Sequence, residues 1–259
     1  MNMHTLRRKL KKIWLIRALA VSRRSLRNKP PFFAKIGFLR SYYADLASYR
    51  KLGTGDFSMS LDDLKPCIYD KTADTPVDPV YFYQDSWCAG KIFKAKPEHH
   101  YDIASNAAMV GIISQFVPTT MIDIRPIRLH MPGLTFKKGT VLDLPFKDGT
   151  ISSLSSICVV EHIGLGRYGD PLDPRGSEKS ISEIIRVLKP GGDLYFTVPI
   201  DAADKIYFNA HRSFTRGHVL ELFGALKLME ERYIYGRDLC PAYDPKLAFG
   251  TGMYHFQKP

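Results

Sequence analysis

Residues 177–200 read SEKSISEIIRVLKPGGDLYFTVPI, a helical pattern followed by a stop and then by a strand pattern. Ile181, Ile184 and Leu188 recur at a spacing that places them on one face of a helix. The Pro-Gly-Gly at 190–192 cannot continue that helix, so we expect the helix to end there. DLYFTVPI is rich in aromatic and β-branched residues and predicts a buried strand. A helix that leads directly into a buried strand is typical of α/β sheets.

The same alternation of strand and helix patterns runs through the chain from His99 onward. Short apolar runs separated by helical patterns indicate a mainly parallel sheet with helices on its faces. Ligands of such sheets bind at the carboxyl ends of the strands, so the residues that follow each strand are the candidate site. The expected strands are 100–105, 119–124, 134–141, 151–160 and 193–200, with a helix at 106–117 and an antiparallel pair at 226–235 and 252–258.

The positive charge of the chain is concentrated near its start. The net charge is +11 over 259 residues, and 45% of the residues are hydrophobic, which is typical of a globular protein. Residues 1–50 hold 13 of the 37 Lys and Arg but only Asp45 among the 26 acidic residues, so the remainder is close to neutral. We therefore expect a basic amphipathic helical extension at 1–55, a lead-in segment at 56–98 that packs on the core, and the main domain at 99–259.

Within the extension, Leu6, Leu10, Ile13 and Trp14 recur at helical spacing among basic residues, which predicts an amphipathic helix. Its apolar stretch is less than half of the roughly 20 residues needed to cross a bilayer. Three interpretations stay open for residues 1–30: docking on an anionic membrane surface, binding nucleic acid, or packing on this chain or a partner. The aromatic-rich residues 32–52 predict a second helix, which we expect to rest on the main domain.

The four cysteines, Cys67, Cys88, Cys158 and Cys240, show neither a CxxC pair nor a metal-ligand spacing. This pattern favours a reducing compartment and ordinary thiols. We expect a cytoplasmic protein that can lie peripherally on the inner face of the membrane.

Three stretches carry a family resemblance: VLDLPFKDGTISSLSSICVVEHI at 141–163, SEIIRVLKPGGDLYFTVP at 182–199 and HRSFTRGHVLELF at 211–223. In order and spacing they resemble the class I S-adenosylmethionine-dependent methyltransferases. DIAS, IDIRP, EHIGLGRYGDP and NAHRSF are more narrowly similar to an uncharacterised bacterial methyltransferase-like family associated with surface-polysaccharide biosynthesis. The resemblance implies a Rossmann-like sheet, mostly parallel with an antiparallel final strand and helices on both faces, and it implies S-adenosylmethionine as the cofactor.

The resemblance also assigns cofactor contacts. Residues 102–106 match a loop that normally reads Asp-x-Gly-x-Gly, with Ala104 and Asn106 in place of the two glycines. Alanine is the smallest side chain, and asparagine tolerates left-handed dihedrals, so we expect an altered loop that still functions. Asp123 matches the acid that accepts hydrogen bonds from both ribose hydroxyls. The implied cofactor-binding residues are Asp102, Ala104, Ser105, Asp123, Ile124, Arg125, Asp143, Leu144 and Glu161, with Asp143 and Leu144 facing the adenine.

Residues 164–176 form a long irregular segment after a predicted strand, and such connections are usually functional. We expect this segment to determine which methyl acceptor is bound. A sugar hydroxyl has a very high pKa, so its methylation calls for a nearby base. The candidates for that base are His162, His211 and Asp170, and the expected substrate-binding residues are Tyr168, Arg175, Asn209 and Arg212. Glu161, Asp170, Asp173 and Asp201 are oxygen ligands that a divalent metal would suit, but no spacing requires a metal.

These expectations combine into an O-methyltransferase that acts on a hydroxyl of a surface glycan or glycan-lipid precursor. The partners of residues 1–30 would be an anionic membrane surface or a glycosyltransferase. One alternative is a catalytically inactive binding or scaffold protein in polysaccharide assembly, which the replaced glycines favour. The other is an RNA methyltransferase, which the basic extension favours and the near-neutral main domain disfavours.

Overall fold

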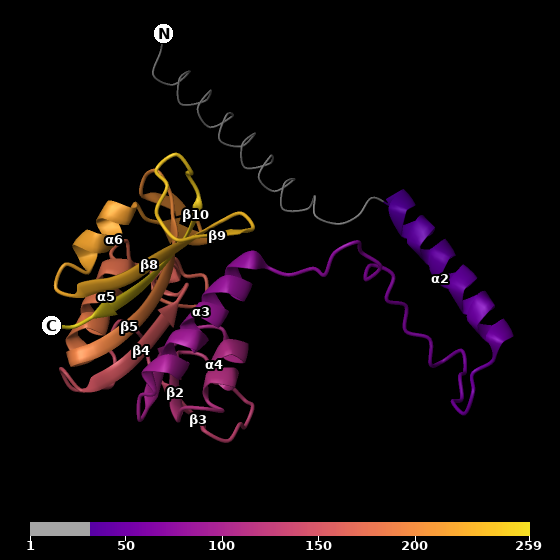
Figure 1. Ribbon diagram of the computed structural model, residues 1–259, viewed down its shortest axis with the longest axis horizontal. Coiled ribbons are helices and arrows are strands. Elements are labelled where there is room, and N and C mark those ends of the chain that lie inside the picture. Colours follow the sequence, from indigo (N-terminus) through magenta and orange to yellow (C-terminus); the bar gives the residue numbers. More distant parts are fainter. Residues whose placement is uncertain (1–31) are drawn as a thin grey trace, which may run out of the picture. The chain divides into compact units, whose positions relative to one another are not determined.

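The computed structural model describes residues 32–259, so the predicted basic helix near the start of the chain lies outside the described part. The chain divides into two compact units, Met1–Pro76 and Val77–Pro259. In the first unit, α2 (Phe32–Leu52) confirms the predicted second helix (Figure 1), and the Phe38 ring contacts the Tyr69 ring edge-on at 5.6 Å. The packing of this helix on the main domain stays a prediction. Within residues 32–259, no helix has the length and apolar character needed to span a bilayer.

The second unit is built on one eight-stranded sheet with the order β3-β2-β1-β4-β5-β10-β8-β9. The first five of these strands are parallel to one another, whereas β10 is antiparallel to both β5 and β8. The mainly parallel sheet and the antiparallel pair predicted from the sequence are therefore confirmed. The strands are β1 (His100–Ile103), β2 (Thr119–Asp123), β3 (Leu134–Lys138), β4 (Ile151–Ile157), β5 (Leu188–Ile200), β8 (Lys227–Tyr235), β9 (Asp238–Cys240) and β10 (Gly250–Gln257).

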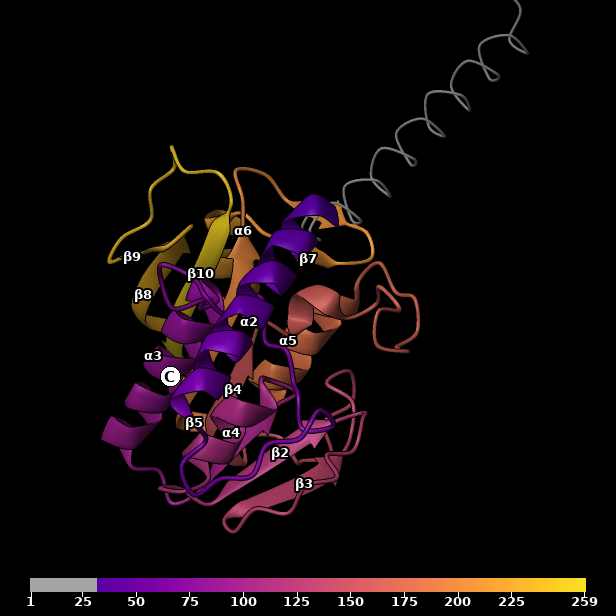
Figure 2. The same cartoon turned by 90° about the vertical axis from the view of Figure 1, so that its right-hand side faces the viewer.

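Helices cover both faces of this sheet (Figure 2). On one face, α3 (Pro79–Ala95) and α4 (Ala107–Ile113) bury a cluster that includes Ile92, Val110 and Met121. On the other face, α5 (Gly176–Val187) and α6 (Arg216–Leu222) pack on a larger cluster that includes Ile184 and Phe196. Neighbouring residues of a strand point to opposite faces, which is why Tyr195 belongs to the first cluster and Phe196 to the second.

The helix α3 was not predicted as a helix, although its ends carry clear signals. Asp78 is the N-cap and accepts hydrogen bonds from the N–H groups of Val80 and Tyr81, and Pro79 occupies the first helical position. At the other end, Lys96 adopts a left-handed conformation with φ of 46°. The junction between the two units, Pro76 to Val77, falls inside the predicted lead-in segment 56–98.

The boundary between α5 and β5 differs from the sequence prediction. The helix ends at Val187 rather than at the Pro-Gly-Gly, and the strand already begins at Leu188. A residue that precedes proline is biased away from the helical region, so Lys189 favours an earlier end of the helix. The hairpin of β6 (Lys205–Tyr207) and β7 (His211–Ser213) was also not predicted.

Candidate active site

A cavity opens at the carboxyl ends of β1, β2 and β4, where the sequence predicted the site. It consists of two adjoining lobes with empty volumes of about 640 Å³ and about 710 Å³, open mouths included. We call the first the Asp123 lobe, because Asp123 lines only that lobe, and the second the Tyr81 lobe for the same reason. The residues that line both lobes are Ala104, Arg125, Cys158, His162 and Tyr168.

The turn after β1 has the backbone that the resemblance implies at its first glycine position. Ala104 has a φ of 49°, in the left-handed region that favours glycine, and its N–H donates to the Ile122 carbonyl at 2.8 Å. Asn106, at the second glycine position, is not left-handed. Its φ is −59°, and its side chain caps α4 by accepting a hydrogen bond from the Ala108 N–H. The tolerance of asparagine for left-handed dihedrals is therefore not needed at Asn106, because this position begins a helix.

Asp102 stabilises this turn through hydrogen bonds and does not line either lobe. The side chain is fully buried, and its carboxylate accepts the Ser105 N–H at 3.0 Å and the Ser155 hydroxyl. The Ser155 oxygen in turn lies 2.9 Å from His100 Nε2. Burial raises the pKa of Asp102 to about 6. Asp102 therefore holds the backbone of Ser105, and Ser105 itself lines the Tyr81 lobe.

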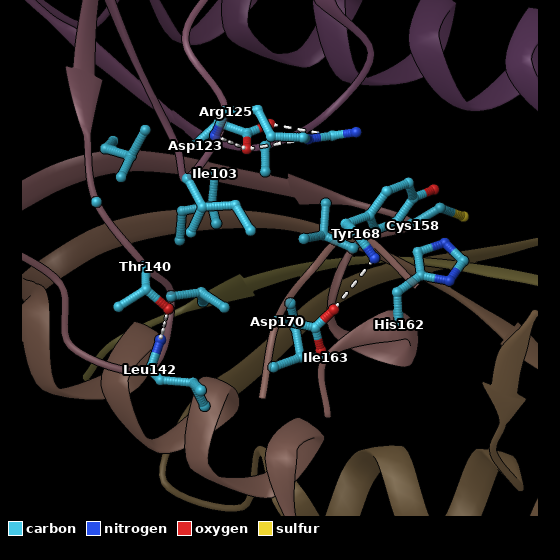
Figure 3. A pocket seen from close by; sticks show the side chains of 16 residues that line it. Ile103, Asp123, Arg125, Thr140, Leu142, Cys158, His162, Ile163, Tyr168 and Asp170 are labelled. Carbon is cyan, nitrogen blue, oxygen red and sulfur yellow. Dashed lines mark hydrogen bonds and ion pairs between the residues drawn. The ribbon is translucent and has the colours of Figure 1, made fainter. Parts of the chain in front are cut away.

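Asp123 lies at the end of β2 with 7% of its surface exposed, and Ile124 lines the same lobe. Its carboxylate accepts the Arg125 N–H at 2.8 Å and pairs with the Arg125 guanidinium at 3.3 Å. That guanidinium also lies over the Tyr168 ring, 4.4 Å from its centroid. Figure 3 shows Asp123 and Arg125 paired at one side of the cavity and Tyr168 beside His162.

Asp143 and Leu144, the expected adenine contacts, do not line the cavity. Thr140, Val141 and Leu142 line the Asp123 lobe, whereas Asp143 is exposed and lies outside it. The Asp143 N–H donates to the Thr140 carbonyl at 3.2 Å, and this turn directs the chain away from the cavity. Leu144 is buried, and its N–H donates to the Glu183 carboxylate at 2.9 Å. The structure therefore corrects the placement of Asp143 and Leu144.

His162 lines both lobes. Its Nδ1 lies 2.7 Å from the Ala210 carbonyl oxygen, which can only accept, and 3.3 Å from Arg167 Nη1. The shorter contact favours a proton on Nδ1 and a lone pair on Nε2. Burial lowers the pKa of His162 to about 4, so the ring is neutral at pH 7. Glu161 lines neither lobe: it is 1% exposed, and burial raises its pKa to about 8. Glu161 Oε1 lies 3.7 Å from His162 Nε2.

Asp170 and Arg212 hold the 164–176 segment in place. The Asp170 carboxylate lines the Asp123 lobe and accepts the N–H groups of Gly164 at 2.6 Å, Gly166 at 3.4 Å and Tyr168 at 3.3 Å. Arg212 is 7% exposed and donates to the carbonyls of the same segment and to Ser177. These contacts give Arg212 a supporting place outside the cavity in place of the expected substrate contact, whereas the role of Asp170 as a base stays a prediction.

Three further predicted residues lie outside both lobes. His211 lies in β7 among aromatic rings, 5.1 Å from Tyr207 and 5.8 Å from Phe249, and burial lowers its pKa. Arg175 is exposed just before α5, and Asn209 is exposed between β6 and β7. The structure therefore brings Tyr168 and His162 together in the lining, to which His211, Arg175 and Asn209 do not contribute.

Cys158 and Tyr81 are among the lining residues that sequence reasoning missed. Cys158 directly follows β4, where the strand-end rule applies, and it has a left-handed φ of 52°. Its Sγ lies 3.1 Å from Gln84 Oε1, and burial raises the pKa of its thiol. Tyr81 comes from α3, and no local pattern indicated that this helix reaches the cavity. All four cysteines of the chain are free thiols, as predicted.

The carboxylates considered as metal ligands do not converge. Asp173 pairs with Lys179 at 2.7 Å, and Asp201 pairs with Lys205 at 2.8 Å. In the part of the chain that the structure describes, no group of three or more His, Cys, Asp or Glu side chains is arranged to hold a metal ion.

Solved structures with a similar fold include methyltransferases. One is 1,6-didemethyltoxoflavin-N1-methyltransferase from Burkholderia thailandensis, with bound 1,6-didemethyltoxoflavin and S-adenosylhomocysteine: 14% identity, coverage of 89% of this chain and 91% of that chain, TM-score 0.50. Another is the N-methyltransferase NodS from Bradyrhizobium japonicum WM9 in complex with S-adenosylhomocysteine: 15% identity, 83% and 97% coverage, TM-score 0.49. The chain has the class I methyltransferase fold, as the sequence predicted.

A family model described as "Caenorhabditis protein of unknown function, DUF268" matches residues 147–230, from just before β4 into β8. No curated protein matches. The match covers less than half of the chain and comes from an uncharacterised family, so it does not indicate an activity for this chain.

Proposed function

We propose that the chain is an S-adenosylmethionine-dependent methyltransferase whose acceptor is a hydroxyl of a surface glycan or glycan-lipid precursor. The observation that carries the first part is the pairing of a left-handed turn at Ala104 with the recessed carboxylate of Asp123 at one cavity. The glycan part rests on the sequence resemblance. Residues 1–30 would bring the protein to an anionic membrane surface, since they are strongly basic.

The residues present fit the cofactor. Asp123 would accept the ribose hydroxyls, the backbone at Thr140–Leu142 would face the adenine, and the turn at Ala104–Ser105 would face the methionine end. When bound, the cofactor supplies the activated methyl group. The protein is then left to align the acceptor and remove its proton. Five residues line both lobes, so the place where the lobes meet is where we expect the acceptor.

His162 is the residue that would take the acceptor's proton. Its Nδ1–H is fixed on the Ala210 carbonyl, which leaves the neutral Nε2 as an acceptor. A proton on Nε2 would lie near the Glu161 carboxyl, 3.7 Å away, which favours the resulting cation once Glu161 is ionised. Tyr168 would form the adjoining wall, with its ring edge-on to His162 at 5.5 Å.

Isothermal titration with S-adenosylhomocysteine tests the cofactor part. We expect saturable binding that Asp123→Asn weakens by about tenfold or more, because a hydrogen bond to a charged group contributes about 1.5–3 kcal/mol. Asp143→Asn is the matched control, since this exposed aspartate lies outside the cavity, and its affinity should equal that of the wild type. Absence of binding to the wild type would refute the proposal.

Mass spectrometry of the surface glycan tests the acceptor part. Deletion of the gene should remove a methyl group from one sugar, and an unchanged glycan would refute the glycan assignment. For the membrane part, liposome co-sedimentation should fall when residues 1–30 are removed, and equal sedimentation of both forms would contradict it.

A scaffold function without catalysis is the second candidate. It is favoured by the Arg125 guanidinium, which already occupies the Asp123 carboxylate, and by the side chain at the left-handed Ala104. Under this alternative, Asp123→Asn would leave cellular function intact.

A further inference from the structure

We propose that Arg125 binds an anionic group of the acceptor, a carboxylate or a phosphate, once the cofactor has taken over Asp123. The inference rests on the proposed function and adds the charge of the substrate and the order of binding. Arg125 is suited to both partners because its side chain is 55% exposed and lines both lobes.

Arg125 contacts Asp123 through its backbone and through its guanidinium, and the guanidinium contact is the easier one to displace. Its backbone N–H donates to Asp123 at 2.8 Å as part of the turn after β2, whereas its guanidinium reaches the same carboxylate at 3.3–3.5 Å. Two ribose hydroxyls would compete with the guanidinium for those oxygens. A partly exposed ion pair of this kind contributes only about 0.2–1 kcal/mol, so the ribose can displace it.

A released guanidinium stays at the place where the lobes meet. It lies over the Tyr168 ring at 4.4 Å, and the guanidinium of Arg167 lies over the same ring at 5.0 Å. Arg167 donates through Nη1 to the Ala210 carbonyl at 2.8 Å, beside Nδ1 of His162. Two cations are therefore held around one aromatic ring next to the candidate base.

The carboxylates that line the lobes keep their charge but would not pair directly with these guanidinium groups. Asp123 would accept the ribose hydroxyls, and Asp170 accepts three backbone N–H groups. A guanidinium presents paired N–H groups that match the oxygens of a carboxylate or phosphate. The guanidinium N–H groups left without a carboxylate partner therefore favour an acceptor with an anionic group close to the hydroxyl that is methylated.

Titration of the 259-residue chain with three probes tests this, at constant ionic strength and with or without saturating S-adenosylhomocysteine. The probes are glucose, glucuronate and glucose 6-phosphate, which share a sugar and differ in charge. With S-adenosylhomocysteine, one of the two anionic probes should bind about tenfold or more tightly than glucose. The probe that binds more tightly identifies the source of the charge. Without S-adenosylhomocysteine, the same probe should bind more weakly.

Arg125→Ala should abolish that preference for the anionic probe. It should also leave S-adenosylhomocysteine bound roughly two- to fivefold more tightly, because Asp123 is freed. Arg128→Ala is the matched control: this exposed arginine lies three residues away and lines neither lobe, so both affinities should match the wild type.

Three results would overturn the inference. Glucose could bind as tightly as both anions, or the two arginine variants could behave alike. Alternatively, Arg125→Ala could weaken S-adenosylhomocysteine binding about tenfold, which would make Arg125 a cofactor ligand. Failure of the proposed function is distinguishable, since the wild type would then not bind S-adenosylhomocysteine at all.

Discussion

Replacement of Glu161 with glutamine should change how the stability of the protein depends on pH. Glu161 is 1% exposed, and its Oε2 is buried without a hydrogen-bond partner in the described structure. Burial raises the pKa of Glu161 from 4.5 to about 8. The folded protein therefore holds a proton that the unfolded chain releases between these pH values. The resulting stability is complete below pH 4.5 and is lost as the pH rises through 8.

The size of the effect follows from the two pKa values. At 1.36 kcal/mol per pKa unit, the difference between 4.5 and about 8 corresponds to about 5 kcal/mol of lost stability above pH 8. Glutamine has nearly the same shape and does not ionise. The free energy of unfolding of Glu161→Gln minus that of the wild type should therefore rise by about 1.4 kcal/mol per pH unit between pH 5 and 8 and then level off.

Urea unfolding at half-unit steps from pH 5 to 9.5 measures this difference. The matched control is Glu221→Gln, at an exposed glutamate of α6, which should follow the wild type at every pH. A difference between Glu161→Gln and the wild type that does not change with pH would refute the burial argument, whatever its absolute size.

Gly164→Ala should lower the melting temperature and displace the 164–176 segment, because φ is +85° and the new Cβ would lie 2.0 Å from the Asp173 carbonyl oxygen; an unchanged melting temperature would contradict this. Arg212→Met should cost about 2–4 kcal/mol and expose the same segment to limited proteolysis, because it leaves carbonyls without their donor. Arg212→Lys should recover part of the loss, and equal cleavage of wild type and Arg212→Met would show that the contacts do not hold the segment. His162→Gln should slow methyl transfer about 10²-fold while changing S-adenosylhomocysteine affinity little. Since the His162 pKa is about 4, the wild-type rate should show no inflection near pH 6.5, and such an inflection would contradict the neutral ring.

The strands and the helix α5 were predictable because their signals are local. Hydrophobic periodicity over a few residues identifies a strand such as β5, and the rule that ligands bind at strand ends then indicates Asp123 and the turn at Ala104. His162 and Tyr168 were found in the same way, as residues that follow β4. Each of these positions depends on the order of elements along the chain.

The roles of other residues depend on contacts between segments far apart in sequence. Tyr81 reaches the cavity because α3 packs beside α4, and Arg212 is a support because its guanidinium meets carbonyls about 40 residues away. Asp143 was misplaced since one turn with Thr140 directs it outward. Residue type alone could not distinguish a carboxylate that faces a ligand from one, such as Asp170, that accepts backbone N–H groups.

The sequence by itself determined the architecture, because the patterning of apolar residues specifies which faces of helices and strands must be buried. It also determined which strand ends carry polar side chains. The tertiary structure alone decided which of those side chains are free, since a group already paired with the backbone cannot serve a ligand. The burial of Glu161 is of this kind, because it arises only where the fold excludes water from its carboxyl group.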